Sequence, residues 1–214
     1  MYAKEAQIDG PTSTVIYFRY IKHSERKRKE ALKLIPEGVE YKKDSLIKNL
    51  YVTDRKNKAA LIMSEPFKDM TFIIQDKSSC LPVHALSQLK HFDDAVVLDC
   101  TSAPGNKSIQ ASEFCKQVYS CEKDEGRFAT LQSRLKESGA SNATAINTDV
   151  IEWIKSKEHP EITTAICDPT CSGSGLFIHK ERQLMKERAN CVKEIRKVSA
   201  WGPKKYQNRV LGIS

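Results

Sequence analysis

The sequence predicts an α/β fold in which a doubly wound parallel sheet follows a small basic α/β subdomain. The first observation is the stretch from Val96 to Ser108, where an apolar run ends at Asp99 and a Pro-Gly turn leads into a helical pattern. The second is a regular alternation of strand-like and helix-like segments from residue 94 onward. The third is an excess of basic residues before that alternation begins. Such a turn leaves backbone N–H groups available at a helix N-terminus, where an anionic or polar ligand can bind.

The composition is that of one globular domain with a smaller subdomain. Of the 214 residues, 40% are hydrophobic, which is enough to bury one core. No apolar run approaches the roughly 20 residues that a membrane helix needs, so we expect no membrane partner. The seven cysteines show no CxxC spacing and no adjacent histidine cluster, so we expect no metal site. Mostly buried thiols in a reducing intracellular compartment fit this pattern.

The net charge of +8 is unevenly spread along the chain. From Val15 to Ala60 there are 13 Lys and Arg against 6 Asp and Glu, and from His179 to Ser214 there are 10 against 3, a balance of +7 in each segment. The segment between them, Leu61 to Ile178, has 11 against 16, a balance of −5. Basic flanks around an acidic core favour a polyanionic partner, RNA or DNA. A solvated basic surface is the alternative that charge alone leaves open.

Residues 15–74 are expected to form the basic subdomain, after a flexible tail at residues 1–14. The predicted elements are a strand at Val15–Ile21, a helix at Ser24–Leu34, short strands or helices at Tyr41–Val52 and Leu61–Met63, and a strand at Thr71–Ile74. The cluster Arg26–Lys29 is either a nuclear address, a phosphate contact or a solvated helix face.

Residues 75–214 are expected to form the core, which begins with a helix at Val83–Leu89. Its predicted strands are Ala95–Asp99, Gln117–Cys121, Asn142–Asn147 and Thr163–Cys167, and the helices between them are Ser108–Cys115, Glu125–Ser138 and Val150–Lys155. Connections this short imply parallel strands with right-handed crossovers. A basic helical region follows at Lys180–Ala200, and Lys204–Ser214 is expected to begin another helix.

Four acidic residues fall at the carboxyl ends of the predicted strands, where doubly wound sheets bind their ligands. They are Asp99, Glu122, Asp149 and Asp168. An acid after the second strand typically accepts hydrogen bonds from a ribose diol, so the pattern favours a nucleoside ligand. The turn after Asp99 contains neither GxGxxG nor GxxxxGK[ST], which argues against a plain dinucleotide dehydrogenase and a P-loop NTPase.

Two motifs carry a family resemblance. Leu98–Lys107 resembles the first motif, and Asp168–Gly175 the fourth motif, of the Sun-type RNA cytosine-5 methyltransferases, while Gln75–Cys80 resembles the segment before their cofactor fold. Asn106 and the Asp-Pro-Thr-Cys sequence are most similar to the branch that methylates large-subunit ribosomal RNA. The resemblance implies a Rossmann-like class I methyltransferase core, S-adenosyl-L-methionine as cofactor, RNA as substrate and a nuclear or nucleolar location.

The resemblance also implies roles for individual residues. The cofactor-binding residues would be Thr101, Ser102, Ala103, Pro104, Gly105, Asn106, Lys107, Glu122, Arg127, Asp149 and Asp168. Glu122 would hold the ribose hydroxyls, Asp149 would lie near the adenine, and Asp168 and Lys107 would also reach the target cytosine. Carboxylates and a lysine can bind the cytosine edge and stabilise charge that develops on the ring.

Methylation of cytosine C5 requires a thiolate that adds to C6. By analogy with the family, Cys171 would assist product release, while the attacking cysteine belongs to a Thr-Cys pair that is absent after Gly175. The alternatives are that Cys171 itself attacks, or that the chain is a non-catalytic RNA- and cofactor-binding module. We expect strands five to seven to be missing, which would expose an apolar sheet edge at Ala165–Cys167 unless another chain or the C-terminal helix covers it. A truncated product, a fragment or a degenerate paralogue would fit that expectation.

Overall fold

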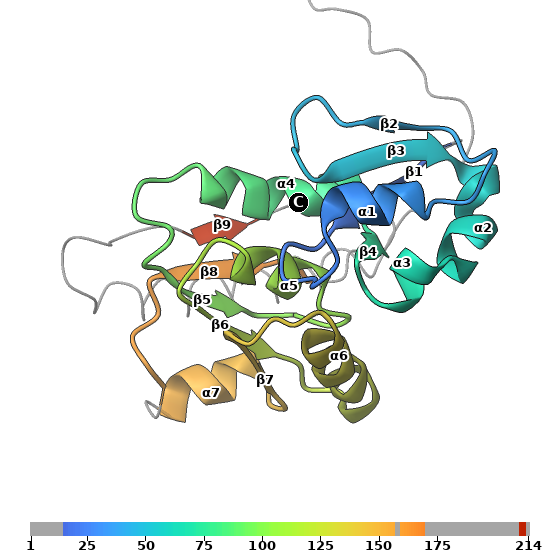
Figure 1. Ribbon diagram of the computed structural model, residues 1–214. Helices are drawn as coiled ribbons and strands as arrows, with labels where there is room; N and C mark the ends of the chain where they lie inside the picture. The colour runs from blue at the N-terminus through green and yellow to red at the C-terminus, as the bar shows by residue number, and fades with distance from the viewer. Residues whose placement is uncertain (1–14, 157–158, 170–209, 213–214) are drawn as a thin grey trace, which may run out of the picture.

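The computed structural model describes residues 15–156, 159–169 and 210–212, which form two sheets and the helices that cover them (Figure 1). The expected tail at residues 1–14 and the expected helix at Lys180–Ala200 lie outside the described residues. None of the described helices combines the length and the apolar character that crossing a bilayer requires.

The N-terminal sheet is antiparallel, with strand order β2-β3-β1-β4. Its strands are β1 (Val15–Tyr20), β2 (Tyr41–Lys43), β3 (Leu50–Asp54) and β4 (Phe72–Ile74), and its helices are α1 (Arg28–Lys33), α2 (Lys58–Met63) and α3 (Glu65–Lys68), with a 3-10 turn, η1 (Arg55–Asn57), before α2. Phe18 is fully buried at the centre of one face, where its ring contacts four other aromatic rings. Those rings belong to Tyr41, Tyr51, Phe67 and Phe72. This aromatic cluster gives the N-terminal sheet and its helices an apolar core of their own.

The C-terminal sheet is parallel, with strand order β7-β6-β5-β8-β9. Its elements are α4 (Lys77–Ser87), β5 (Val96–Asp99), α5 (Asn106–Ser112), β6 (Gln117–Cys121), α6 (Glu125–Glu137), β7 (Ala143–Ile146), α7 (Val150–Ser156), β8 (Thr164–Cys167) and β9 (Val210–Gly212). The chain runs outward from β5 to β7 and then returns to the other side of β5 at β8. This is the Rossmann-like order that the alternation of strands and helices predicted, and its topological switch point lies between β5 and β8.

Alternate residues of the parallel strands point to opposite faces, and each face is covered by helices. Val97 and Val118 pack on the side of α4 and α5, where α6 also adds apolar residues. Leu98 and Ala165 pack on the other side, against Val150 and Ile154 of α7. The polar loops at the strand ends are therefore the parts of this sheet that remain available for a ligand.

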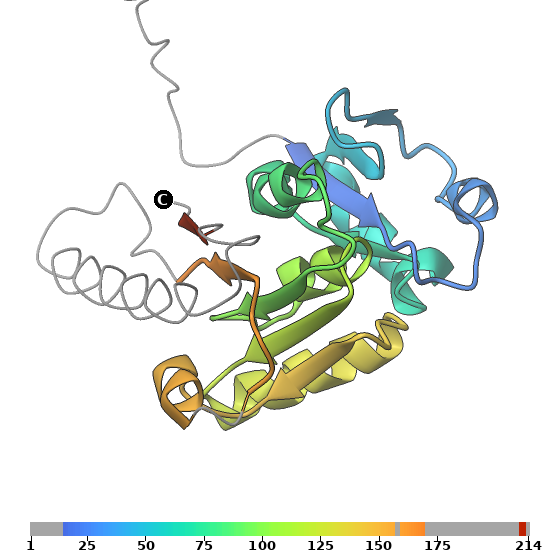
Figure 2. The same ribbon diagram turned by 90° about the vertical axis from the view of Figure 1, so that its left-hand side faces the viewer.

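Two predictions about the edge of the sheet were wrong. Residues 210–212 form β9, a strand, where the sequence predicted the start of a helix. This strand pairs in parallel with β8, joining Ile166 to Leu211, so Ala165–Cys167 is an internal strand and no exposed edge (Figure 2). Strand β9 thus occupies the position beside β8 that was expected to lack a strand. A three-residue apolar run carries too little periodicity to predict a strand, and only its pairing with β8 defines it.

The segment around Pro82 also differs from expectation. Helix α4 begins at Lys77, where the sequence predicted a helix only from Val83. Pro82 lies inside the helix and is buried, as are Val83 and Leu86. The sequence Gln75–Cys80 therefore leads straight into a helix that packs against α5.

Candidate functional site

The turn between β5 and α5 folds back on itself through backbone hydrogen bonds. The amide of Ser102 donates to the carbonyl of Cys121 (3.1 Å), and the amide of Gly105 donates to the carbonyl of Ser102 (2.7 Å). Gly105 has φ +102°, a left-handed conformation that strains any residue with a Cβ atom. Its carbonyl then accepts from the amide of Ile109 (2.8 Å), which starts the helix. The turn is therefore held by the ends of two adjacent strands.

A cavity of about 240 Å³ opens over this turn. It is lined by residues from four segments that are far apart in the chain: Ser79, Asp99, Thr101, Ser102, Ala103, Pro104, Asn106, Lys107, Arg127, Asp168 and Pro169. Eight of the predicted cofactor residues line it, namely Thr101 to Pro104, Asn106, Lys107, Arg127 and Asp168. The other three, Gly105, Glu122 and Asp149, are outside the lining.

Lys107 and Asp168 form an ion pair inside the cavity. The Nζ atom of Lys107 lies 2.7 Å from Oδ2 of Asp168, and it also donates a hydrogen bond to the Ser79 hydroxyl (2.8 Å). The two charged side chains are partly exposed, 17% for Lys107 and 33% for Asp168, so a ligand can still reach them. The pair brings the two sequence motifs together at the switch point between β5 and β8.

Asp99 is the most enclosed carboxylate of the site. Its side chain is 2% exposed, and its Oδ2 accepts a hydrogen bond from the Ser108 hydroxyl (2.7 Å). Burial raises the pKa of Asp99, and the Ser108 hydrogen bond and the Lys107 charge offset this only in part. The carbonyl of the same residue accepts from the Ser102 hydroxyl (2.8 Å), so Asp99 fixes both the turn and the helix that follows it.

Glu122 lies outside the lining but is linked to the cavity by Arg127. Arg127 lies 3.4 Å from Oε2 of Glu122 and donates a hydrogen bond to the carbonyl of Ala103 (2.8 Å). The other carboxylate oxygen, Oε1, accepts from the amide of Asp124 (3.0 Å). Glu122, at the end of β6, is thus held with Oε2 close to the guanidinium of Arg127, which borders the turn.

Asp149 lies outside the lining of the cavity and makes contacts of its own. Its Oδ1 accepts a hydrogen bond from the amide of Ile151 (2.9 Å) at the start of α7, and Lys123 lies 3.9 Å from its other oxygen. A capping carboxylate of this kind stabilises a helix start whether or not a ligand is present. Its contacts therefore give Asp149 a structural role, and its role toward a cofactor stays a prediction.

Sequence reasoning missed two residues that the fold brings to the cavity, Ser79 and Pro169. Ser79 lies in the segment Gln75–Cys80, which resembles the family, but nothing in its local pattern indicated that its hydroxyl on α4 would contact Lys107. Asp99 was recognised as a strand-end acid and was left out of the predicted site, although it lines the cavity. Cys171, predicted as catalytic, lies outside the described residues.

One polar atom of the cavity is left without a partner. The hydroxyl of Thr101 is buried and has no hydrogen-bond partner among the described residues. A buried hydroxyl normally finds a partner in protein or water, so this atom is available to a polar ligand of the cavity. The turn at the start of α5 is surrounded by carboxylates, an ammonium, a guanidinium and a hydroxyl. This set of hydrogen-bonding groups fits a nucleoside that carries an amino acid. No group of three or more His, Cys, Asp or Glu in the described ranges could hold a metal ion.

Comparison with known proteins gives relatives by sequence and by structure, although no protein-family model matches the chain. The 25S rRNA (cytosine-C(5))-methyltransferase rcm1 of Schizosaccharomyces pombe is 33% identical over 149 residues, which cover 68% of this chain and 32% of that protein. The 28S rRNA (cytosine-C(5))-methyltransferase of Drosophila melanogaster is 27% identical over 175 residues, which cover 73% of this chain and 39% of that protein. The chain thus spans about a third of the length of these curated relatives.

Solved structures show the same fold at lower identity. A methyltransferase homologue from Pyrococcus horikoshii superposes with a TM-score of 0.72 at 19% identity, covering 87% of this chain and 61% of that one. NSun6 from the same organism, solved with the S-adenosylmethionine analogue SFG, superposes with a TM-score of 0.71 at 11% identity, covering 86% and 72%. By its sequence relatives and its Rossmann-like fold, the chain is therefore a homologue of the Sun-type RNA cytosine-5 methyltransferases.

Proposed function

We propose that this chain binds S-adenosyl-L-methionine in the cavity over the β5–α5 turn, as part of a protein that methylates cytosine C5 in RNA. The observation that carries the proposal is the meeting of two sequence motifs in one cavity, with Lys107 of the first motif 2.7 Å from Asp168 of the second. Relatives named as rRNA cytosine-C5 methyltransferases support the reaction and ribosomal RNA as the substrate.

The proposed cofactor contacts follow from the chemistry of the lining. The backbone of the turn and the Thr101 hydroxyl supply polar contacts, and Asp168 supplies a carboxylate for the cationic amine of the amino-acid end. Glu122 would accept hydrogen bonds from the ribose hydroxyls, since its carboxylate is held close to Arg127 at the cavity border. When bound, S-adenosyl-L-methionine supplies a methyl group that is activated by a sulfonium centre.

For the RNA side, we propose that Lys107 and Asp168 also contact the target cytosine. Their side chains are partly exposed, so they can serve a second ligand that enters from outside. The target base has to leave its stack to reach such a pocket. Cys171 is proposed to assist product release, and the thiolate that adds to C6 is proposed to come from the Thr-Cys motif of the family.

The proposed partner and place of action follow from the same relatives. Eukaryotic relatives named for ribosomal RNA support a proposed location in the nucleus or nucleolus. The basic N-terminal segment, with a balance of +7 between Val15 and Ala60, suits RNA phosphates. A fluorescent fusion that stays outside the nucleus would argue against this location.

Calorimetric titration with S-adenosyl-L-methionine tests the cofactor part of the proposal. We expect the 214-residue chain to bind, and Glu122→Gln to weaken binding, while Glu65→Gln, an exposed acid on α3, leaves it unchanged. No binding by the unaltered chain would contradict the proposal.

Incubation with radiolabelled cofactor and ribosomal RNA tests the transfer. Transfer to cytosine by a protein that includes the Thr-Cys motif supports the full proposal. Binding without transfer by the chain and also by a longer protein that includes the Thr-Cys motif would support the non-catalytic module instead. Loss of transfer in both Cys171→Ala and Cys171→Ser would contradict the assignment of Cys171 to release, because a hydroxyl cannot replace an attacking sulfur.

A further inference from the structure

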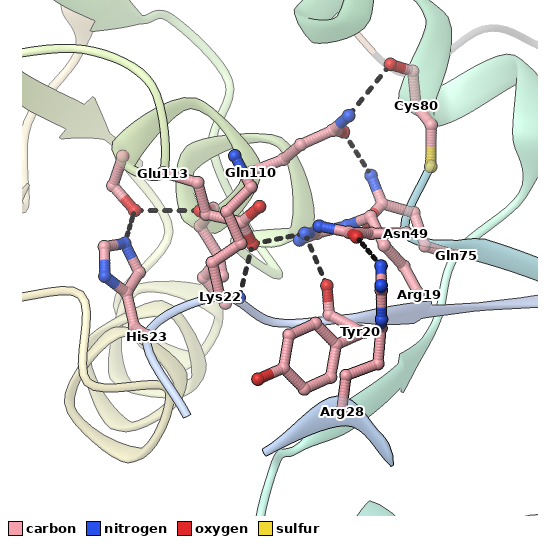
Figure 3. Close-up of polar contacts among 12 residues, drawn as sticks. Arg19, Tyr20, Lys22, His23, Arg28, Asn49, Gln75, Cys80, Gln110 and Glu113 are labelled. Carbon is pink, nitrogen blue, oxygen red and sulfur yellow. Dashed lines mark hydrogen bonds and ion pairs between the residues drawn. The ribbon is translucent and has the colours of Figure 1, made fainter. Parts of the chain in front are cut away.

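Arg19 is a buried charged residue outside the cavity lining, at the boundary between the two sheets (Figure 3). It lies on β1 and is 1% exposed, and it is among the largest fully buried side chains of the described chain. Its Nε donates to Oε1 of Gln75 (2.7 Å), and its guanidinium pairs with the carboxylate of Glu113, which is also 1% exposed. A charge buried this deeply destabilises the fold unless it is paired, so the partners of Arg19 define its role.

The direction of Arg19 follows from the alternation along β1. Phe18 and Ile16 point into the aromatic cluster of the N-terminal sheet, and Tyr17 and Arg19 point to the opposite face. That face lies against α4 and the end of α5, so Arg19 is directed out of its own subdomain and toward the parallel sheet. Figure 3 shows its guanidinium between Gln75 and Glu113.

Further polar contacts bind the same end of α5. Gln75 donates to Oε1 of Gln110 (3.0 Å), and Gln110 donates to the carbonyl of Cys80 on α4 (3.1 Å). The amide of Lys22 donates to Glu113 (3.3 Å), and the ring of His23 forms a hydrogen bond with the Ser112 hydroxyl (2.9 Å). Residues 110, 112 and 113 are thus each held by side chains or backbone of residues 19–23 and 75 (Figure 3).

The other end of α5 carries the candidate site. Asn106 and Lys107 line the cavity from its first turn, and Ser108 binds Asp99. The helix has seven residues and is about 10 Å long at 1.5 Å per residue. A short helix moves as a rigid rod, so a shift at Glu113 changes the position of Lys107 as well.

We propose that the Arg19–Glu113 pair positions the cofactor site by fixing α5 from the N-terminal sheet. The inference rests on the proposed function, in that the cavity is taken to bind S-adenosyl-L-methionine. Arg19 and Glu113 touch no lining residue of the cavity in the contacts described here and are positioning residues, not catalytic ones. The N-terminal sheet then has a role besides its proposed contact with RNA, because it completes the geometry of a site in the parallel sheet.

The test uses calorimetry with S-adenosyl-L-methionine on the full 214-residue chain. The variants are Glu113→Gln, which keeps the shape but removes the charge, and Arg19→Met/Glu113→Gln, which leaves no unpaired buried guanidinium and so favours a folded chain. At a temperature where far-ultraviolet circular dichroism shows every variant folded, we expect affinity to fall about tenfold in the double variant, equal to about 1.4 kcal/mol. Affinity within twofold of the unaltered chain would overturn the proposal.

A matched control separates positioning from a general loss of stability. Leu61→Ala removes a fully buried side chain from the core of the N-terminal sheet, and Leu61 packs in the aromatic cluster and not on α5. We expect this control to lower the melting temperature and to leave cofactor affinity unchanged. An equal loss of affinity in Leu61→Ala would show that N-terminal stability alone matters, and would overturn the proposal.

Hydrogen exchange distinguishes a failure of this proposal from a failure of the proposed function. The amide of Ile109 closes the first turn of α5, and it should exchange faster in the double variant than in the unaltered chain or in Leu61→Ala, with no ligand present. If the unaltered chain fails to bind the cofactor, the proposed function fails, and this exchange still decides whether the pair positions α5. Unchanged exchange at Ile109 would then overturn the positioning.

Discussion

Nζ of Lys107 and Oδ2 of Asp168 lie 2.7 Å apart, which joins the first turn of α5 to the end of β8. Lys107 follows β5 and Asp168 follows β8, two strands that are adjacent in the sheet but separated in the chain by two complete strand–helix units. The contact therefore forms only when the chain crosses back over β5. It places the ammonium of Lys107 and the carboxylate of Asp168 where a bound ligand would contact both.

Asp168→Asn is expected to weaken binding of S-adenosyl-L-methionine by about tenfold, because one charged hydrogen bond is worth about 1.5 kcal/mol or more. The melting temperature should change little, since the partly exposed pair contributes about 1 kcal/mol at most to folding. Calorimetry and thermal unfolding measure the two effects. Asp44→Asn is the control: Asp44 also pairs with a lysine at 2.7 Å and caps the Leu46 and Ile47 amides, but neither Asp44 nor its partner Lys77 lines the cavity, so it should lower stability without changing affinity.

Gly105→Ala is expected to destabilise the protein by about 2 kcal/mol, through the left-handed backbone and a crowded Cβ. Gly105 has φ +102°, and a Cβ there would lie 3.1 Å from Cδ1 of Leu131. Gly38→Ala is the matched control, since Gly38 has φ +84° and nothing within 4 Å of a Cβ. Urea unfolding should show a smaller loss for Gly38→Ala than for Gly105→Ala. Equal losses would mean that packing against Leu131 adds nothing.

Asp99 should make the free energy of unfolding fall as the pH rises, whereas most carboxylates of folded proteins have the opposite effect. Burial raises its pKa in the folded protein above the ordinary value of 3.8, so the folded state binds the proton more tightly than the unfolded state. Its contribution to the free energy of unfolding therefore falls as the pH rises from about 4 through the folded pKa. Asp99→Asn removes this dependence.

Urea unfolding of the unaltered chain and of Asp99→Asn between pH 4.5 and 7.5 measures the effect, since other titrating groups are common to both. The stability of the variant relative to the unaltered chain should increase with pH. A difference that stays flat over this range would contradict a raised pKa for Asp99.

The cysteines of the described chain should be unreactive while the protein is folded. Cys80, Cys115 and Cys121 are buried, and burial raises the pKa of each thiol to about 12. About one in ten thousand of such thiols is ionised at pH 8, and the thiolate is the reactive form. Iodoacetamide followed by peptide mass spectrometry should label these three only after unfolding in urea. Labelling of Cys80 in the folded chain would contradict the packing of α4 against α5.

Most of the fold was predicted from local patterns. Six elements lie within two residues of their predicted bounds, namely β5, β6, β7, β8, α6 and α7. Each is an apolar run or an amphipathic stretch that is bounded by turn residues. The turn from Cys100 to Asn106 was predicted for the same reason, since small residues and a Pro-Gly pair leave few other conformations. The start of α4 and the strand β9 were not predicted, because Pro82 usually ends a helix and three residues make too short a pattern.

The sequence by itself determined the alternation of strands and helices, the turn after Asp99 and the motif residues around it, all of which depend on neighbours in the chain. Only the tertiary structure decided which of these residues meet. In the folded chain, Ser79 contacts Lys107, and Asp149 lies outside the cavity lining. Strand β9 pairs with β8, and Arg19 is buried against Glu113. Contacts of this kind depend on packing between segments distant in the chain, and no local pattern specifies the partner of a buried charge until the sheets are in place.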